Sequence, residues 1–266
     1  MSEHGFETRR EPGTGIEHYW QEVSKMGSEV LAAQQPLLVE LAGRMAQTVM
    51  QDRRIFIFGT GHSHMMAEEA FFRAGGLAAA VPILSGELML HENPFLSSRL
   101  ERTPGLAAPL LDQYQPQEGE MLFIFSNSGV NQLPVEMAIE GRLRGLVVVG
   151  VCSHAYASVA PISRIGKRLE DIADYCLDNG GLPGDAVIPV GVTGWRTGAT
   201  STILGALLWN CLLSETLLLL NEVGAELPVI ASFNMPGADA HNQTVLAKWS
   251  QKNPYLRAWY KADLCG

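Results

Sequence analysis

Two kinds of hydrophobic pattern divide the chain. Up to about residue 51, apolar residues recur at helical spacing, first from Ile16 to Val23 and again from Leu37 to Met45. Pro36 lies between the two runs and removes a backbone donor, so the pattern predicts two helices. We therefore expect a helical segment over residues 1–52, packed on the rest of the protein or in a dimer interface, and one domain over residues 53–266.

Beyond residue 52, short apolar runs alternate with helical stretches. The runs cover residues 55–58, 80–84, 121–126, 146–151 and 175–177. Continuous apolar strands that alternate with helices are typical of a parallel sheet covered on both faces. The chain is therefore predicted to be an α/β protein, whose ligands bind at the edge where the carboxyl ends of the strands meet.

Charge and composition narrow the kinds of ligand. The chain has 28 acidic and 19 basic residues, a formal charge of -9, which argues against a nucleic-acid or anionic-membrane surface. A bound phosphate would then be held locally, by hydroxyls, backbone N–H groups and helix N-termini. The polar N-terminal stretch has no apolar signal-peptide core, so a cytoplasmic protein is expected. The long apolar run at 203–220 is interrupted by polar residues, which favours a helix buried in protein over a membrane span.

The cysteines predict neither a zinc site nor a disulfide framework. They are scattered along the chain, without a C-x-x-C pair, at Cys152, Cys176, Cys211 and Cys265. We expect buried free thiols, with no metal and no cofactor.

Two strand ends carry glycine- and hydroxyl-rich loops. After the first strand, residues 59–63 read Gly-Thr-Gly-His-Ser, which favours a tight turn that brings Gly61, His62 and Ser63 to a phosphate. The alternative is an ordinary strand-to-helix turn. A dinucleotide site is not indicated, because the third glycine is absent.

The loop after the third strand gives a stronger signal. Residues 126–131 read Ser-Asn-Ser-Gly-Val-Asn and lead into a helix, so small polar groups surround one concave anion site, unless they form only a Ser/Asn turn. A third cluster at residues 197–202 opens the long apolar helix. Thr200 or Ser201 is either its N-cap or a ligand contact.

These three signatures, in this order, resemble the sugar isomerase (SIS) domain family of phosphosugar isomerases, etherases and sugar-sensing regulators. The segments FGTGHSHMMAEEAFFRAGG, LMLHENPF and DNGGLPGDA are similar to a subgroup of sugar isomerase domain-containing proteins related to phosphoheptose-isomerase-like proteins. The resemblance implies a five-stranded parallel sheet of flavodoxin-like order, helices on both faces, and homodimers or homotetramers that bind phosphosugars near subunit interfaces. It implies that Ser63, Ser126 and Ser128 bind the sugar phosphate and that Thr200 and Ser201 close the site. Further candidate substrate contacts in the same two loops are Gly61, His62, Asn127 and Asn131. Asn131 stands where many family members have Ser or Thr.

Aldose–ketose isomerisation needs an acid and a base tuned toward neutral pH. His91 and Glu92 follow the second strand, and either serve the reaction or only cap a helix end. Of the neighbouring glutamates Glu68 and Glu69, Glu69 has the better spacing to face the site, with a solvated helix face as the alternative. His64 is expected to be exposed.

A late polar cluster supplies the last candidate. His241 lies with Asp239 and Asn242 before a helix predicted over Gln243–Ser250. It either reaches a neighbouring subunit's site, as the resemblance implies, or helps to cap the helix.

The prediction is a phosphosugar isomerase that works through an enediol-type intermediate, with acid and base drawn from His91, Glu92, Glu69 and His241. The alternatives are a phosphosugar lyase or etherase, and a non-catalytic sugar-phosphate sensor. A hydrolase is disfavoured, because no G-x-S-x-G motif is present. The expected ligand is a phosphorylated sugar, with no nucleic acid and no membrane as partner.

Overall fold

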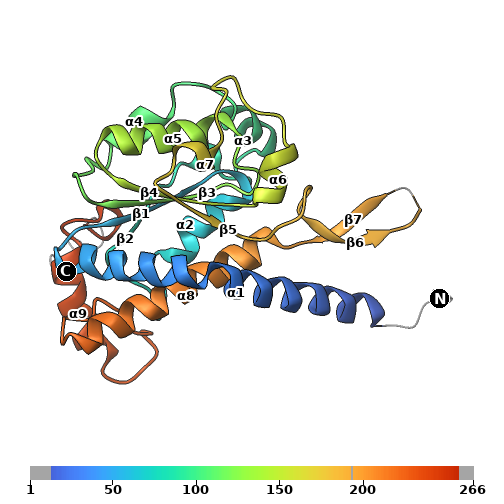
Figure 1. The fold of residues 1–266 in the computed structure, drawn as a ribbon. Helices are drawn as coiled ribbons and strands as arrows, with labels where there is room; N and C mark the ends of the chain where they lie inside the picture. The colour runs from blue at the N-terminus through green and yellow to red at the C-terminus, as the bar shows by residue number, and fades with distance from the viewer. Residues whose placement is uncertain (1–12, 193, 258–266) are drawn as a thin grey trace, which may run out of the picture.

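The computed structural model describes residues 13–192 and 194–257 (Figure 1). The polar N-terminal stretch up to residue 12 and Cys265 lie outside these described residues. A parallel sheet in the order β2-β1-β3-β4-β5 forms the centre. Its strands are β1 (Ile55–Gly59), β2 (Ala80–Pro82), β3 (Met121–Phe125), β4 (Val147–Cys152) and β5 (Tyr175–Asp178). The predicted α/β fold with a five-stranded parallel sheet is confirmed.

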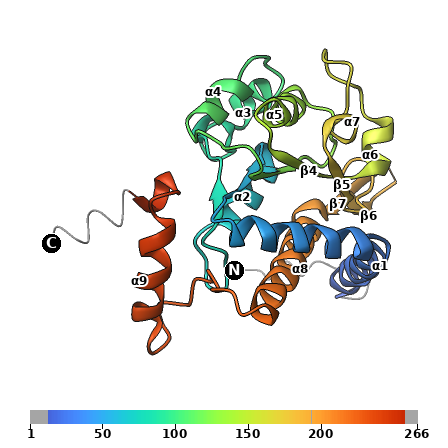
Figure 2. The ribbon, with the colours of Figure 1, turned by 60° about the vertical axis from the view of Figure 1, so that its left-hand side comes forward.

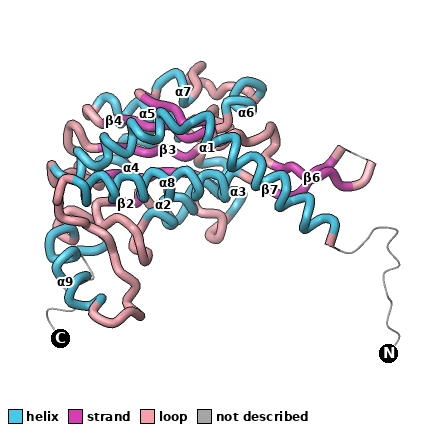
Figure 3. Tube along the Cα trace, turned by 60° about the horizontal axis from the view of Figure 1, so that its bottom comes forward, coloured by secondary structure: helices cyan, strands magenta, loops and turns pink. Residues whose placement is uncertain are grey.

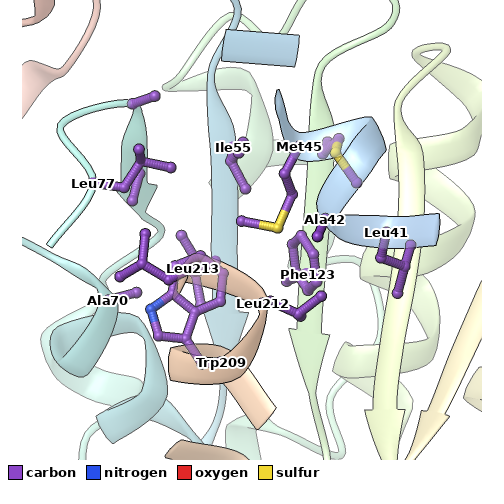
Figure 4. Close-up of a cluster of buried hydrophobic side chains, with 14 of the residues drawn as sticks. Leu41, Ala42, Met45, Ile55, Ala70, Leu77, Phe123, Trp209, Leu212 and Leu213 are labelled. Atoms are coloured by element: carbon purple, nitrogen blue, oxygen red, sulfur yellow. The ribbon is translucent and has the colours of Figure 1, made fainter. Parts of the chain in front are cut away.

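Helices cover both faces of the sheet, which is why the inner strands are apolar on both sides (Figure 1). One face packs against α3 (Pro94–Leu100), α4 (Ala107–Asp112), α5 (Gln132–Leu143), α6 (His154–Val159) and α7 (Leu169–Ile172). The other face packs against α1 (Thr14–Met50), α2 (Met65–Ala70) and α8 (Ser201–Glu222). Figure 4 shows this second core, where the ring of Trp209 from α8 meets that of Phe123 from β3 edge-on at 5.5 Å.

The N-terminal segment is one helix, so the predicted break at Pro36 is wrong. Helix α1 runs without interruption from Thr14 to Met50. An interior proline costs about 3 kcal/mol in a helix, but Pro36 lies on the exposed side, where water can solvate the freed carbonyl of Ala32. Burial of Leu41 and Met45 against α8 holds the helix together beyond the proline.

Helix α8 explains the long apolar run near the C-terminus. Its length and composition would suffice to cross a membrane. In the structure it lies along α1 and under the sheet, and its buried side includes Leu208, Trp209 and Leu212 (Figures 1 and 3). The apolar character of this side is accounted for by burial in the protein core.

A β-hairpin, which the sequence analysis did not predict, precedes α8. Strands β6 (Ala186–Val190) and β7 (Trp195–Ala199) pair antiparallel and extend away from the main sheet (Figure 1). Their base is anchored on α1, because the Tyr19 hydroxyl donates to the carbonyl oxygen of Ala199 at 2.7 Å. The hairpin therefore fixes the chain that enters α8.

Helix α9 (Ala238–Trp249) begins earlier than predicted. Gly237, with φ +80°, starts it, so Asp239 and His241 lie inside the helix rather than before it. Asn242 is buried and its amide bonds both the N–H and the carbonyl oxygen of Ala231, each at 2.9 Å. Figure 2 shows α9 at the far side of the molecule from α6 and the hairpin.

Candidate functional site

Three of the predicted loops meet at the carboxyl edge of the sheet. Their residues line one small cavity between the ends of β1, β3 and β4 and the start of α8. The lining residues are Ser63, Met66, Phe125, Ser126, Asn127, Val151, Asn179, Ser201 and Thr202. The structure thus brings together four predicted contacts, Ser63, Ser126, Asn127 and Ser201, at the edge where ligands of open parallel sheets bind.

The glycine loop after β1 depends on two glycines. A Cβ at Gly59 would lie 2.2 Å from the carbonyl oxygen of Ser63, so no larger residue fits there, and Gly61 has φ +57°. The chain then makes a 3-10 turn, η1 (Gly61–His64), that turns Ser63 toward the cavity. His62 is exposed and does not line it. Within the described residues, the Ser63 hydroxyl has no hydrogen-bond partner.

The serine loop after β3 is closed by a turn in which the Gly129 N–H donates to the Ser126 carbonyl oxygen at 2.9 Å. Ser126 is buried, and its hydroxyl bonds no group in the part of the chain that the structure describes. Ser128 and Asn131 are half-buried and do not line the cavity. Ser126 and Asn127 are therefore the members of this loop that face the cavity.

An amide pair provides the most specific donor of the site. The Asn179 amide nitrogen donates to Asn127 Oδ1 at 3.0 Å, and Asn179 Oδ1 accepts from the Gly181 N–H at 2.9 Å. These bonds fix the orientation of the Asn127 amide, whose Nδ2 is buried and has no partner among the described residues. A buried unpaired donor is costly unless a ligand or water accepts from it. Sequence reasoning missed Asn179, although it lies in the DNGGLPGDA segment.

The start of α8 is occupied by an internal carboxylate. Asp185 accepts from the backbone N–H groups of Thr200 at 3.1 Å and Ser201 at 2.8 Å, and from the Ser201 hydroxyl at 2.6 Å. A carboxylate at a helix N-terminus is stabilised by the orphan N–H groups and the helix dipole. Thr200 is buried and does not line the cavity, whereas Ser201 and Thr202 do.

A hydroxyl donates one hydrogen, so the Asp185 bond decides what Ser201 can offer a ligand. The hydrogen of this hydroxyl points to Asp185, so Ser201 can only accept further hydrogen bonds. A phosphate oxygen is also an acceptor, so Ser201 has no hydrogen left to donate to it. Thr60 in the glycine loop is committed in the same way, since its hydroxyl donates to Glu101 Oε2 at 3.0 Å. Among the side chains that line the cavity, four keep a donor with no acceptor in the described residues: the hydroxyls of Ser63, Ser126 and Thr202 and the amide of Asn127.

His64 is buried, not exposed as expected. Its Nδ1 lies 3.3 Å from Glu68 Oε1, and its Nε2 accepts from the Ser85 N–H at 3.4 Å, so the ring is neutral with its hydrogen on Nδ1. Burial lowers the pKa of His64, a nearby His91 lowers it further, and the contact with Glu68 raises it in part. The imidazole thereby joins the glycine loop to the segment that follows β2.

His91 and Glu92 lie on that same segment, beside the glycine loop. Leu90 Cδ2 is 4.0 Å from the place of a Cβ at Gly61, so this segment packs beside the glycine loop, although neither His91 nor Glu92 lines the cavity. His91 Nε2 and Glu92 Oε1 are 3.8 Å apart, and both side chains are more than half exposed. Neither caps a helix: Asn93 caps α3, with Oδ1 accepting from Phe95 and Leu96 N–H groups.

The other two candidate acids and bases are not brought to the cavity. Glu69 pairs with Arg73, which lies beyond the end of α2, and accepts from Asn210 of α8 at 3.4 Å. His241 contacts the carbonyl oxygen of Val229 at 2.8 Å. Val229 bridges to Leu77 ahead of β2, so His241 lies toward the amino edge of the sheet within this chain.

The cavity is small, and larger hollows lie elsewhere. It encloses about 10 Å³, about the space of one water, so a phosphosugar must bind at its opening or part the loops. A groove of about 330 Å³ between α1 and α8 is lined mainly by apolar side chains. A hollow of about 450 Å³ beside Arg54 and Lys252 lies at the amino edge. Neither contains the strand-end hydroxyls, so the small cavity is the candidate site.

The doubly covered parallel sheet and its strand-end serine loops define the class of protein. A model of the SIS domain family matches residues 18–153, and the chain belongs to this family. UPF0309 proteins of Brucella canis and Brucella suis are each 39% identical to it over 226 residues, 85% of this chain and 91% of theirs. Within SIS-domain proteins, the chain is a member of the UPF0309 family.

A solved structure has the same fold. A phosphoheptose isomerase from Francisella tularensis aligns with a TM-score of 0.51 over 78% of this chain and 98% of that chain. The two are 12% identical, so the likeness concerns the fold alone. The chain is thus a SIS-domain protein that is structurally similar to a phosphosugar isomerase.

Proposed function

We propose that this protein binds a phosphorylated sugar at the opening of the cavity and isomerises it between its aldose and ketose forms. The observation that carries the proposal is the convergence, at the carboxyl edge of the sheet, of side-chain donors that have no partner among the described residues. They belong to Ser63, Ser126, Asn127 and Thr202. Such donors bind phosphate without a basic surface, which suits a chain of formal charge -9. The phosphate would sit at the cavity opening, with the sugar extending toward His91 and Glu92.

His91 and Glu92 supply the acid and the base in this proposal. The base removes the proton from the carbon beside the carbonyl while the acid protonates the carbonyl oxygen, which gives an enediol. Return of the proton to the former carbonyl carbon and loss of the proton from the other hydroxyl complete the interconversion. The pair is exposed in the single chain, so a neighbouring subunit or the closing loops would shield the intermediate from water. A homo-oligomer with sites near subunit interfaces follows from this proposal.

A thermal-shift screen of sugar phosphates against their unphosphorylated parents tests binding, and product analysis of each hit tests turnover. We expect stabilisation only by the phosphorylated form, with conversion of an aldose to its ketose. His91→Gln and Glu92→Gln should retain binding and lose turnover. Elimination products would favour a lyase, and binding without turnover a sensor. No phosphate-dependent stabilisation would refute the proposed site.

A further inference from the structure

Two thiols meet on the face of the sheet opposite the cavity. Cys152 ends β4, and Cys176 lies in β5, where it pairs in register with Gly150. Paired residues of neighbouring strands share a face, and so do residues two apart in one strand. Cys152 and Cys176 therefore point to the same side, and their sulfur atoms are 3.4 Å apart.

An imidazole completes the cluster. His154 is the first residue of α6, two positions after Cys152, and a nitrogen of its ring and the two sulfurs all lie within 4.8 Å of one another. Ser153 fixes the turn between β4 and α6. Its buried hydroxyl accepts from the Tyr156 N–H at 3.0 Å and donates to the Gly181 carbonyl oxygen at 2.5 Å. The three ligand atoms thus come from a rigid strand, its neighbour and a capped helix.

Two carboxylates surround the imidazole. Asp178 Oδ2 is 3.8 Å from His154 Nδ1, and Glu170 Oε2 is 3.7 Å from Nε2. Asp178 is held in turn by its Oδ1, which accepts from the N–H groups of His154 at 3.1 Å and Gly180 at 2.9 Å. Carboxylates in this position orient metal-bound histidines in many sites.

We propose that Cys152, His154 and Cys176 bind a Zn²⁺ ion. Zinc takes thiolate and imidazole ligands in tetrahedral geometry, and two sulfurs bound at about 2.3 Å are roughly 3.8 Å apart. The observed 3.4 Å is close to that separation. The sulfurs of a disulfide are about 2.05 Å apart, so Cys152 and Cys176 are free thiols. A water or one of the two carboxylates takes the fourth position.

The ion would fasten β5 to the turn that follows β4. Leu177 and Val151 are paired in register next to the cluster, and Ser153, between two of the ligands, donates its N–H to the Asn127 carbonyl oxygen at 2.9 Å. Zinc binding would therefore stabilise the folded edge of the sheet. This proposal is independent of phosphosugar binding.

The test measures zinc in untagged protein purified under reducing conditions. We expect about one zinc per chain by mass spectrometry of metals. After removal by a chelator, Zn²⁺ titrated against a chromophoric chelator should rebind and raise the melting temperature. Co²⁺ in place of Zn²⁺ should give a thiolate-to-cobalt charge-transfer band. This measurement uses the wild-type chain, so it does not depend on whether a variant folds.

Matched variants separate this site from adventitious thiol binding. Cys176→Ser and His154→Ala should weaken Zn²⁺ binding by more than about 100-fold, beyond what loss of an orienting partner alone causes. The double variant Cys211→Ser/Cys265→Ser removes the other two cysteines of the chain and should keep full affinity. The proposal is overturned if reduced wild-type protein binds no zinc and gives no Co²⁺ thiolate band, or if Cys176→Ser binds zinc as tightly as the wild type.

Discussion

The serine loop after β3 and the start of α8 are alike in sequence but differ in the state of their donors. Both are rich in Ser and Thr and lead into a helix. In the serine loop, the amide nitrogen of Asn127 is buried and has no partner among the residues that the structure describes. At the start of α8, the Asp185 carboxylate accepts from two backbone N–H groups and from the Ser201 hydroxyl.

The difference shows that a hydroxyl-rich helix start is not by itself an anion site. An acceptor from elsewhere in the chain can fill it, as Asp185 does from fifteen residues before Thr200. What distinguishes a ligand contact is a donor that the protein leaves unpaired and holds in place. The following substitutions challenge that distinction.

The largest effect is expected at Asn127. Asn127→Ala removes the oriented donor, and a hydrogen bond to a charged group contributes about 1.5–3 kcal/mol. Phosphosugar affinity should fall about 10- to 100-fold by calorimetry. Asn221→Ala, an exposed asparagine at the other end of α8, serves as the control. Equal affinity of Asn127→Ala and wild type would remove Asn127 from the site.

Loss of the Asp185 carboxylate at the start of α8 should lower the stability of the fold. Asp185→Ala leaves the N–H groups of Thr200 and Ser201 unpaired and puts alanine at φ +58°, so we expect a loss of about 2 kcal/mol or more in the free energy of unfolding. Asp185→Asn keeps one acceptor oxygen and tolerates the left-handed backbone, and should lose less than half as much. Urea unfolding measures both. An Asp185→Ala protein as stable as wild type would mean that the carboxylate does not cap α8.

His64 should make stability depend on pH. Burial lowers its folded-state pKa, so between that value and the unfolded value of about 6.5 the unfolded chain binds the extra proton. The free energy of unfolding should therefore fall as pH drops below about 6.5, and level off below the folded pKa. His64→Gln should flatten this slope, whereas the exposed His62→Gln should not. An unchanged slope in His64→Gln would contradict the neutral buried imidazole.

The smallest effect on binding is expected at Ser201. Its hydroxyl hydrogen is committed to Asp185, so Ser201→Ala should change phosphosugar affinity less than about threefold, well under the loss of one hydrogen bond to a charged group. A loss as large as that of Asn127→Ala would show that the start of α8 binds the phosphate, and the contrast between the two regions would fail.

The fold was predictable because its signals are local. Each inner strand is a short apolar run, and alternation with helices defines a parallel sheet. The errors came where tertiary contacts override local preference. Pro36 lies within one helix because burial of α1 against α8 outweighs the proline. Strands β6 and β7 form a hairpin in which Val187 and Ile188 are buried against Met26 and Leu204, while β7 is largely exposed and shows no apolar alternation.

The site was predictable only where a motif follows a strand. Ser63, Ser126 and Asn127 could be placed in this way, because strand ends of a parallel sheet share one edge. Asn179 and Asp185 could not, since their roles depend on contacts across the fold. The cluster of Cys152, His154 and Cys176 was missed because strand register, which the sequence does not state, brings the two thiols together.

The most direct test of the account observes the Asn127 side-chain amide itself. In ¹⁵N-labelled protein, its Nδ2 resonances can be assigned by comparison with Asn127→Asp. We predict that a phosphosugar identified in the screen shifts these resonances as a new hydrogen bond forms, while the unphosphorylated parent sugar does not. If a phosphosugar binds and leaves the Asn127 amide unmoved, the cavity does not hold the phosphate and the central claim is contradicted.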